Sequence, residues 1–437
     1  MPTSIEEMRG DAVAAFRAGV AAVQPERLLP GLIRRDGDAV LVRGRALPAA
    51  LGRRVVMALG KAGPALADAW LELLPEWADE LVVLAPHGTP VFERVGAGGS
   101  VLFGAHPIPD AEGEAATREL LGIARDLGED DLLVVLLSGG ASALLAAPRR
   151  GLALEDVRAT TLLLLEAGAP IQALNTVRRQ LLAAAGGGLA ATAAPATVVT
   201  LVLSDVLGDS LPDIASGPTV PSPTGPEEAL AVLEQFGVRV HTPAAVTSCL
   251  RRQACEPTTT PPGSGRVEIL GNNRTAVDAA AAALDSRGYQ VILHDGHLTG
   301  EARERGRQLG ALACSISSPR PVAFVVGGET TVTVRGPGRG GRSQELALAA
   351  ALRLAGGPPR VLLAAGTDGV DGTSKAAGAM VDPRSAQRMT AAAIDAPAAL
   401  TDNDSAPALA AAGDTIVTGP TGSNVCDLIL LLAAPGD

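Results

Sequence analysis

Arg342 follows a very glycine-dense stretch and is the first candidate for chemistry. The stretch runs from Gly327 to Glu345 and reads GGETTVTVRGPGRGGRSQE. Glycines lack a Cβ and let backbone N–H groups converge on an anion, and a helix predicted to begin near Ser343 would add its own N–H groups. The glycines concerned are Gly336, Gly338, Gly340 and Gly341. Arg342 would then face the bound anion, whereas the alternative is a solvated hairpin loop without a ligand.

Several other apolar runs also end in polar, glycine-rich or acidic loops. These loops carry Lys61, the Ser-Gly-Gly-Ala-Ser run at 138–142, Asp205, and Asp368 with Asp371. Phosphoryl transfer needs this set of groups, because cations, Mg2+ and backbone donors must neutralise the phosphate oxygens. Each loop alone could be ordinary turn chemistry, but their number in one chain favours phosphoryl transfer.

Alternating strands and helices must position these loops. We expect strands at 53–60, 81–85, 101–105, 132–137 and 196–203, and a second series at 267–270, 290–293, 323–326, 330–335, 361–365 and 427–432. Helices are expected at 275–284, 300–315 and 343–355, and Asn175 is expected to cap an earlier one. Near-continuous Val and Leu runs between helices are typical of parallel sheets covered on both faces. The carboxyl ends of such strands line the binding crevice, so the loops are expected to converge.

The predicted fold class is α/β, with two α/β domains whose sheets are largely parallel and helix-covered, and an active-site cleft between them. The stretch CEPTTTPPGSG at 255–265 has no periodicity and predicts the domain boundary. Residues 1–255 would form the domain with Lys61 and Asp205, and residues 256–437 the domain with Arg342 and Asp368. The N-terminal sheet could also take strands from 266–318.

Composition limits the classes of partner. The 437 residues are 47% hydrophobic and 19% charged, which is typical of globular protein and sufficient for two domains. Aromatic residues make up only 2% and the net charge is -11, which argues against nucleic acid or an anionic membrane as a partner. The N-terminus lacks the regions of a signal peptide, and no apolar run is long enough to span a membrane, so a cytoplasmic protein is expected.

Metal and dinucleotide motifs are weak or absent. The four cysteines form no CxxC pair, which argues against a zinc site or a disulfide framework. His294 and His297 flank Asp295 and could bind a metal, but a plain loop after a strand is the favoured interpretation. The chain has neither GxxxxGK(S/T) nor a helix-opening GxGxxG, which disfavours P-loop kinases and ordinary Rossmann dehydrogenases.

Nine sequence strings occur in order along nearly the whole chain. They are ALGKAG, HPIPDAEG, LLSGGASALL, NTVRRQLLAAAGGGLA, LSDVLGDSLPDIASGPTVP, LGNNRTAVDAA, GGETTVTVRGPGRGGRSQELALA, AAGTDGVDGTSKAAGAMVD and TGPTGSNVCDL. In this order they resemble the glycerate 2-kinases of the MOFRL type, which are often labelled hydroxypyruvate reductase. The resemblance implies ATP- and Mg2+-dependent phosphorylation of D-glycerate at its 2-hydroxyl, giving 2-phosphoglycerate. It also implies that Lys61 and Arg342 are essential.

The chain departs from the pattern of that family in a few places. Leu182 and Ala185 stand where a serine and then Lys-Gly-Gly are common, so no phosphate role can be carried over from that lysine. Ser343 stands where Asn is usual, and Ser222 where Asp is common.

Physical demand suggests roles for the cations and acids. Lys61 would neutralise charge on the transferred γ-phosphoryl group, and the Arg342 fork would clamp the glycerate carboxylate or bridge it to phosphate. Asp205 is the third catalytic candidate, either as a Mg2+ ligand or to orient the substrate hydroxyl, and Asp368 is a second candidate metal ligand. The other predicted substrate- or cofactor-binding residues are Ser138, Gly139, Gly140, Ser142, Asn175, Arg178, Ser216, Gly217, Thr219, Asn272, Gly328, Glu329, Thr330, Gly340, Gly341, Gln344, Glu345, Thr367, Asp371 and Asn424.

Two other functions stay open from the sequence. An NAD(P)H-dependent hydroxypyruvate reductase would share the substrate skeleton, and a non-catalytic sugar-acid or nucleotide sensor would share the loops. Oxidation of NAD(P)H with hydroxypyruvate, against ADP formation with glycerate, separates the two enzymes. The expected partners are the small molecules D-glycerate and ATP, bound by a monomer or homodimer.

Overall fold

The computed structural model describes residues 4–255 and 265–436. The chain divides into two compact units: the Lys61 unit is Leu28–Leu270, and the Arg342 unit combines Met1–Arg27 with Gly271–Asp437. This division differs from the predicted boundary at 255/256 at both ends of the Lys61 unit. The predicted linker lies almost wholly outside the described residues, and the cleft expected between the domains stays a prediction.

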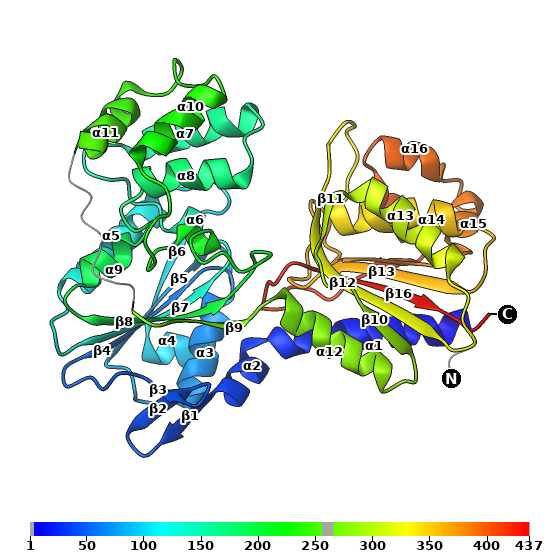
Figure 1. Ribbon diagram of the computed structural model, residues 1–437, viewed down its shortest axis with the longest axis horizontal. Helices are drawn as coiled ribbons and strands as arrows, with labels where there is room; N and C mark the ends of the chain where they lie inside the picture. Colours follow the sequence, from blue (N-terminus) through cyan, green and yellow to red (C-terminus); the bar gives the residue numbers. More distant parts are fainter. Residues whose placement is uncertain (1–3, 256–264, 437) are drawn as a thin grey trace. The chain divides into compact units, whose positions relative to one another are not determined.

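Helix α1 (Ile5–Val23) explains the first difference. A capping box starts this helix, and its apolar face packs against α12 (Asn273–Asp285), as Figure 1 shows. Arg9 adds ion pairs to the buried Asp382 at 2.6 Å and to the buried Asp414 at 3.1 Å. The N-terminal helix therefore belongs to the core of the Arg342 unit.

Six strands form the sheet of the Lys61 unit. In spatial order they are β6 (Ser100–Gly104), β5 (Glu80–Pro86), β4 (Arg54–Leu59), β7 (Leu132–Ser138), β8 (Thr197–Leu203) and β9 (Val267–Gly271). The neighbours from β6 to β8 pair parallel, as predicted, and every residue of β7 is buried. Strand β9 lies at the edge of this sheet, which explains the second difference in the boundary.

Helices cover both faces of the parallel sheet (Figure 1). Helices α3 (Gly63–Leu73) and α4 (Glu93–Gly98) lie on one face, and α5 (Ala111–Arg125) and α9 (Gly188–Ala193) on the other. A separate apolar cluster joins α7 (Leu154–Glu166), α8 (Ile171–Leu181), α10 (Pro226–Gln235) and α11 (Ala244–Cys255). The remaining elements are α2 (Pro25–Leu32), α6 (Ala141–Leu144), the 3-10 helix η1 (Ile214–Ser216), and a small antiparallel sheet of β1 (Ile33–Asp36), β2 (Ala39–Val42) and β3 (Arg45–Ala46).

The strand order creates a switch point in this sheet. The chain runs outward from β4 through β5 to β6 and then returns to place β7 on the other side of β4. At such a point a crevice opens outside the carboxyl ends of the two central strands. The turn after β4 holds Lys61, and the turn after β7 holds Gly139 and Gly140. The fold thus brings together two of the loops singled out by the sequence.

The α/β class is confirmed, but the sheet of the Arg342 unit is mixed rather than largely parallel. Its spatial order is β10 (Gln290–Leu293), β12 (Val322–Thr331), β16 (Asp427–Ala433), β13 (Arg360–Gly366), β14 (Gly378–Val381) and β15 (Thr415–Ile416), with β11 (Leu298–Glu301) also paired to β12. Strands β12 and β13, joined through α14 (Arg342–Leu354), are both antiparallel to β16, which lies between them. A continuous apolar run identifies a buried strand but not its direction, so the prediction failed here.

Two helices cover each face of the mixed sheet (Figure 1). Helices α1 and α12 lie on one face, and α13 (Ala302–Ser315) and α14 on the other. The short helices α15 (Ser385–Ala391), α16 (Ala396–Thr401) and α17 (Ser405–Ala411) pack beside α14.

Two local predictions are wrong. No separate strand spans 330–335, because β12 continues without a break to Thr331. Beyond that residue, the Thr333 backbone N–H donates to the Glu301 side chain at 3.2 Å instead of to a neighbouring strand. Asn175 is not a helix cap but a buried residue inside α8.

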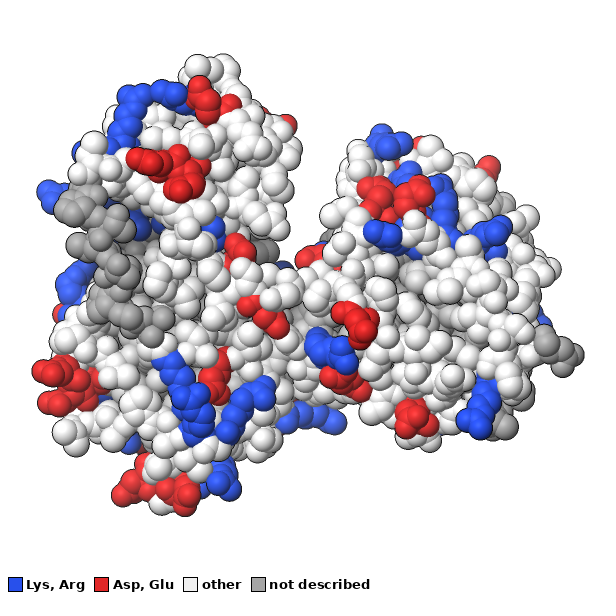
Figure 2. All heavy atoms as spheres, viewed as in Figure 1, with Lys and Arg blue, Asp and Glu red and all other residues white. Residues whose placement is uncertain are grey.

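Charged side chains of both signs are interspersed on the face shown in Figure 2. They form small groups separated by uncharged surface, and this face has no large area of a single sign. Among the residues that the structure describes, no helix combines the length and the hydropathy needed to cross a bilayer.

Candidate active site

Lys61 lies in the turn between β4 and α3. Gly60 has a φ of 109°, and a Cβ there would lie 2.5 Å from the Ser138 carbonyl oxygen, so the close approach requires glycine. The Lys61 backbone N–H donates to the Gly139 carbonyl at 2.9 Å. The Ser138 hydroxyl accepts from the Ala62 N–H at 3.0 Å. The turn after β4 is thereby fixed against the turn after β7, and the lysine side chain starts from a rigid base.

Lys61 and His106 lie against Gly140, and the charge of Arg178 also acts on His106. A Cβ at Gly140, whose φ is 85°, would lie 3.0 Å from Lys61 Cγ and 3.4 Å from the His106 ring. Burial, followed by the charges of Lys61 and Arg178, lowers the pKa of His106 to about 4. The imidazole is therefore uncharged at neutral pH although it lies beside two cations. We call Lys61, His106 and Arg178 the Lys61 cluster.

The cations of the Lys61 cluster are available to a ligand. Within the described parts of the chain, neither the Lys61 ammonium nor the Arg178 guanidinium has an ion pair or a hydrogen bond to a protein group. Burial lowers the pKa of Arg178, which reflects the cost of a desolvated cation without an anion. A bound phosphate or carboxylate would remove that cost, so the cluster is suited to an anionic ligand.

Other predicted hydroxyl ligands of the Lys61 unit form two separate hydrogen-bonded pairs, one with Ser142 and Ser216 and one with Thr219. The Ser142 and Ser216 hydroxyls bond each other at 2.9 Å. The backbone is left-handed at Ser216 and Gly217, with φ values of 60° and 61°, and such strain at a non-glycine residue is common at binding sites. Thr219 is instead a core residue, because its buried hydroxyl accepts from that of Thr200 at 2.7 Å.

Asp205 and Asn175 also belong to the Lys61 unit. Asp205 follows β8 and lies against Gly139, where a Cβ would fall 1.7 Å from its carboxylate. Asn175 is buried, and its Oδ1 has no hydrogen-bond partner among the described residues. A buried amide oxygen in that state is a candidate contact for a ligand or a water molecule.

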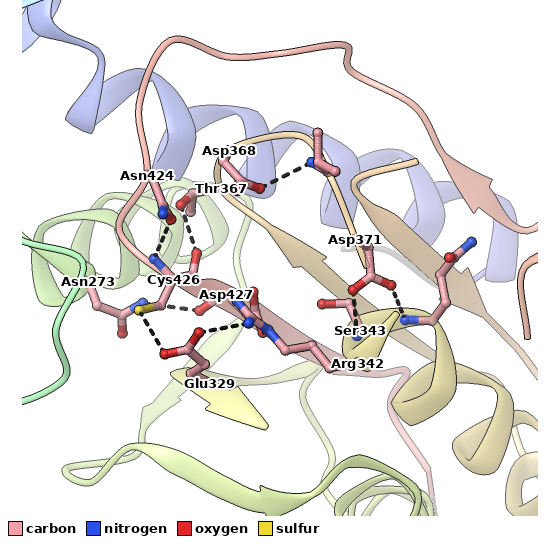
Figure 3. A network of polar contacts seen from close by, with 12 residues as sticks. Asn273, Glu329, Arg342, Ser343, Thr367, Asp368, Asp371, Asn424, Cys426 and Asp427 are labelled. Carbon is pink, nitrogen blue, oxygen red and sulfur yellow. Dashed lines mark hydrogen bonds and ion pairs between the residues drawn. The ribbon is translucent and has the colours of Figure 1, made fainter. Parts of the chain in front are cut away.

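Arg342, the first residue of α14, pairs with two carboxylates (Figure 3). Its Nε and Nη2 atoms contact Asp427 at 2.7 and 3.0 Å, and Nη1 contacts Glu329 at 2.7 Å. Asp427 opens β16 and lies opposite Gly328 of β12 and Gly366 of β13. The guanidinium is thus held at the edge of the mixed sheet by a bidentate ion pair.

The ion pair changes the role expected for Arg342. Burial alone would lower the pKa of Arg342, but Asp427 and Glu329 raise it above its ordinary value. Burial raises the pKa of Asp427, and the charge and hydrogen bonds of Arg342 oppose that rise. Because Asp427 already occupies the fork, only the outward N–H groups of Nη1 and Nη2 remain for a ligand. The Nε side of the fork therefore serves the protein itself, and a substrate clamp by Arg342 stays a prediction that would have to use the Nη1 and Nη2 side.

Asp371 occupies the N-terminus of α14 (Figure 3). Its carboxylate accepts the backbone N–H groups of Ser343 at 3.0 Å and Gln344 at 2.8 Å. Burial raises the pKa of Asp371 to about 7, and the two backbone bonds oppose this rise. The helix N–H groups that the sequence assigned to a bound anion are used by a carboxylate of the protein itself.

The glycine-rich loop does not form the predicted anion nest. The backbone N–H groups of Gly336, Gly338, Arg339 and Gly340 all donate to protein oxygens. A Cβ at Gly338 would lie 2.4 Å from the Asp402 carbonyl oxygen. The glycines serve close packing instead, and Gly341 similarly has the Asp371 carboxylate 2.3 Å from its Cβ position.

Polar residues around Asp427 brace the start of β16 (Figure 3). The Thr367 hydroxyl donates to the Cys426 carbonyl at 2.7 Å, and the Cys426 N–H donates to the Asn424 side chain at 3.2 Å. The Asn273 amide donates to the Asp427 carbonyl at 3.1 Å. These contacts position Asp427, and through it Arg342.

The remaining predicted residues of the Arg342 unit have structural surroundings. Asn272 caps α12, Thr330 is buried in β12, and Glu345 is buried in α14. Gln344 is fully buried, and neither atom of its amide group has a partner in the described parts of the chain.

Two residues of these groups were missed by the sequence reasoning. Asp427 begins the apolar run DLILLLA, and His106 begins the string HPIPDAEG after a strand. His106 follows a strand, which is the signal that selected the other loops, whereas Asp427 begins a strand and carries no such signal.

The residues fit Mg2+ in chemistry but do not form a cage for it. The described residues contain no group of three or more His, Cys, Asp or Glu side chains that could hold a metal ion. Mg2+ usually binds through one or two carboxylates together with substrate phosphates. Asp368 Oδ1 accepts the Val370 N–H at 3.1 Å, and Oδ2 is left for such a contact. Asp205 and Asp368 stay the predicted ligands.

Comparisons with known proteins establish the family. The MOFRL family matches residues 322–427, and a domain of unknown function, DUF4147, matches residues 11–251. The D-glycerate 2-kinase of Thermotoga maritima is 38% identical over 390 residues, which cover 87% of this chain and 90% of that protein. The chain belongs to the glycerate 2-kinase family.

Other members of the glycerate 2-kinase family agree in fold. The crystal structure of glycerate kinase (EC 2.7.1.31) from Thermotoga maritima matches with a TM-score of 0.84 at 35% identity, covering 98% of this chain and all of that chain (100%). A relative from Agrobacterium vitis, provisionally named a hydroxypyruvate reductase, is 40% identical and covers 87% of each chain. The family resemblance and the two-domain α/β class are therefore confirmed.

Proposed function

We propose that this protein transfers the γ-phosphoryl group of ATP to the 2-hydroxyl of D-glycerate, giving 2-phosphoglycerate and ADP. The Lys61 cluster is the observation that carries the proposal. Lys61 lies at the switch point of a parallel sheet, where nucleotide and phosphate ligands bind in this fold class, and within the described residues neither it nor Arg178 has a protein partner. The relatives named glycerate 2-kinase support the choice of substrate.

The residues have distinct proposed roles. Lys61, with Arg178, neutralises the charge that develops on the transferred phosphoryl oxygens. Asp205 orients the 2-hydroxyl for attack in line with the leaving ADP. Arg342 supplies a fixed positive charge through its outward N–H groups. Mg2+ bound to the substrate phosphates would supply further neutralisation of phosphate charge, and Asp205 and Asp368 stay its predicted ligands.

The reductase alternative has less support. The first strand-to-helix turn of a dinucleotide-binding sheet carries glycines that admit a pyrophosphate. In this chain the turn after β4 reads Gly60-Lys61-Ala62-Gly63 and is tied to the turn after β7. A lysine in this turn can neutralise a transferred phosphoryl group, a demand that hydride transfer does not make.

A coupled assay tests the proposal. With ATP, Mg2+ and D-glycerate, the product should be consumed by enolase alone, because enolase accepts 2-phosphoglycerate. A signal that requires added phosphoglycerate mutase would contradict the 2-hydroxyl as acceptor. Oxidation of NAD(P)H with hydroxypyruvate, without ADP formation from glycerate, would support the reductase. A cytoplasmic location and a monomeric or homodimeric state are further parts of the proposal.

A further inference from the structure

The segment at 402–406, which comprises the connection from α16 to α17 and the first two residues of α17, bonds to the loop that precedes Arg342. The Gly338 N–H donates to the Asp402 carbonyl at 3.0 Å, and the Arg339 N–H donates to the Asp404 side chain at 2.8 Å. The Ala406 N–H returns a bond to the Arg339 carbonyl at 2.9 Å. The conformation of the loop is therefore set by a segment more than 60 residues away in the sequence.

Asn403 is central to this segment and uses all of its side-chain hydrogen-bonding groups. Its Oδ1 accepts the backbone N–H groups of Arg335 at 2.7 Å and Gly336 at 3.1 Å. Its Nδ2 donates to the Thr333 carbonyl at 3.3 Å and to Glu345 Oε2 at 2.8 Å. The residue is only 6% exposed and has a φ of 55°, a conformation that asparagine tolerates better than most residues.

These bonds reach both sides of Arg342. Thr333 to Gly336 lie before it in the loop, and Glu345 follows it by three residues in the first turn of α14. Glu345 is held in turn by Arg303, whose Nε donates to Oε1 at 2.8 Å. The sequence alone gives no sign of a role for Asn403, because all these partners are distant along the chain.

We propose that Asn403 is a positioning residue for phosphoryl transfer. By joining the glycine-rich loop to α14, it fixes the backbone at Arg342 and so aims the guanidinium that Asp427 and Glu329 hold. The inference rests on the proposed kinase activity. A displacement of about 1 Å in a catalytic group can lower the rate about 100-fold, so a residue with this role need not touch substrate.

Asn403→Asp is the first test. It keeps the acceptor for the loop N–H groups but removes the donors to the Thr333 carbonyl and to Glu345, and it places two carboxylates side by side. We expect kcat to fall by about 10- to 100-fold. Asp402→Asn is the matched control, because that exposed neighbour contributes only its backbone carbonyl to the loop, and its kcat should equal that of the unaltered protein.

The double variant Asn403→Asp/Glu345→Gln reverses the direction of the bond. Gln at 345 can donate to Asp at 403 and still accept from Arg303, while the net charge of the pair is unchanged. Part of the lost turnover should return, because the bond between 403 and 345 is restored while the Thr333 carbonyl stays without its donor. Failure of the swap to restore activity would overturn the positioning role, as would full activity of Asn403→Asp alone.

A second readout separates positioning from mere loss of stability. If Asn403 acts through Arg342, the fall in kcat caused by Asn403→Asp should largely vanish in an Arg342→Lys background. Equal falls in both backgrounds, or a fall explained by a lower melting temperature, would contradict the inference. Failure of the proposed function would look different, because the unaltered protein would then form no 2-phosphoglycerate.

Discussion

At the scale of residues, the Lys61 side chain has no protein anion to neutralise it within the described chain, so its charge is free for substrate. Lys61→Ala should lower kcat about 10²- to 10³-fold, as is typical for the loss of one preorganised charge-stabilising group. Its melting temperature should stay near that of the unaltered protein, because no ion pair is lost. Lys375→Ala, at the chain's other lysine, is the control and should keep its turnover. Unchanged turnover in Lys61→Ala would remove Lys61 from the site.

Arg342 should behave differently, because it carries stability as well as charge. Arg342→Ala leaves the Asp427 carboxylate buried without its partner, which typically costs about 3–5 kcal/mol in the free energy of unfolding. Arg342→Ala/Asp427→Asn removes that charge and should recover part of the loss while staying inactive. Urea unfolding of the two variants measures the difference. Equal stability of both variants would show that the ion pair does not matter for folding.

His106 predicts a pH dependence of stability. Its pKa in the folded state is about 4, below the ordinary value of 6.5, so protonation favours the unfolded chain. Its neutral form therefore contributes stability that is lost as the pH falls from 6.5 towards 4. His106→Gln stays neutral and should lose less stability over that window. Urea midpoints from pH 7 to pH 4.5 test this, and parallel curves for the two proteins would contradict it.

At the scale of elements, the glycine-rich loop should tolerate no side chain where it meets residues 402–404. Gly338→Ala would bring a Cβ to 2.4 Å from a carbonyl oxygen, so the loop must shift and kcat should fall about 10-fold or more. Gly10→Ala is the control, because no atom lies within 4 Å of its Cβ position inside α1, and it should raise stability by about 1 kcal/mol. Normal turnover in Gly338→Ala would show that the loop position is unimportant.

Strands and single site residues could be predicted from the sequence, whereas contacts between distant elements could not. Apolar runs such as β7 and β8 were located because burial on both faces leaves a continuous Val and Leu signal. Lys61 and Arg342 stood out because each follows a strand in a glycine-rich turn. The pairing of Arg342 with Asp427, and of Asp371 with α14, joins positions distant in the sequence, and no local pattern encodes it. The predicted nest failed for that reason.

At the scale of the whole molecule, the two units should differ in autonomy. The Lys61 unit is one continuous segment with its own sheet, so a fragment of residues 28–270 should unfold cooperatively by itself. A fragment of residues 271–437 lacks α1 and exposes the apolar face that α1 covers, so it should aggregate or unfold. Fusing residues 1–27 to it through a flexible linker should restore cooperative unfolding. Equal stability of the 271–437 fragment with and without residues 1–27 would contradict the assignment of α1 to the Arg342 unit.

The central position of β16 also affects how the protein folds during translation. The strand that separates β12 from β13 follows both of them in the sequence and is therefore translated after them. Until β16 leaves the ribosome, the edges of β12 and β13 that pair with it stay unpaired, and Arg342 lacks its ion pair with Asp427. A nascent or prematurely terminated chain would therefore carry a folded Lys61 unit beside a sheet that lacks its middle, which is the kind of exposed edge that chaperones bind.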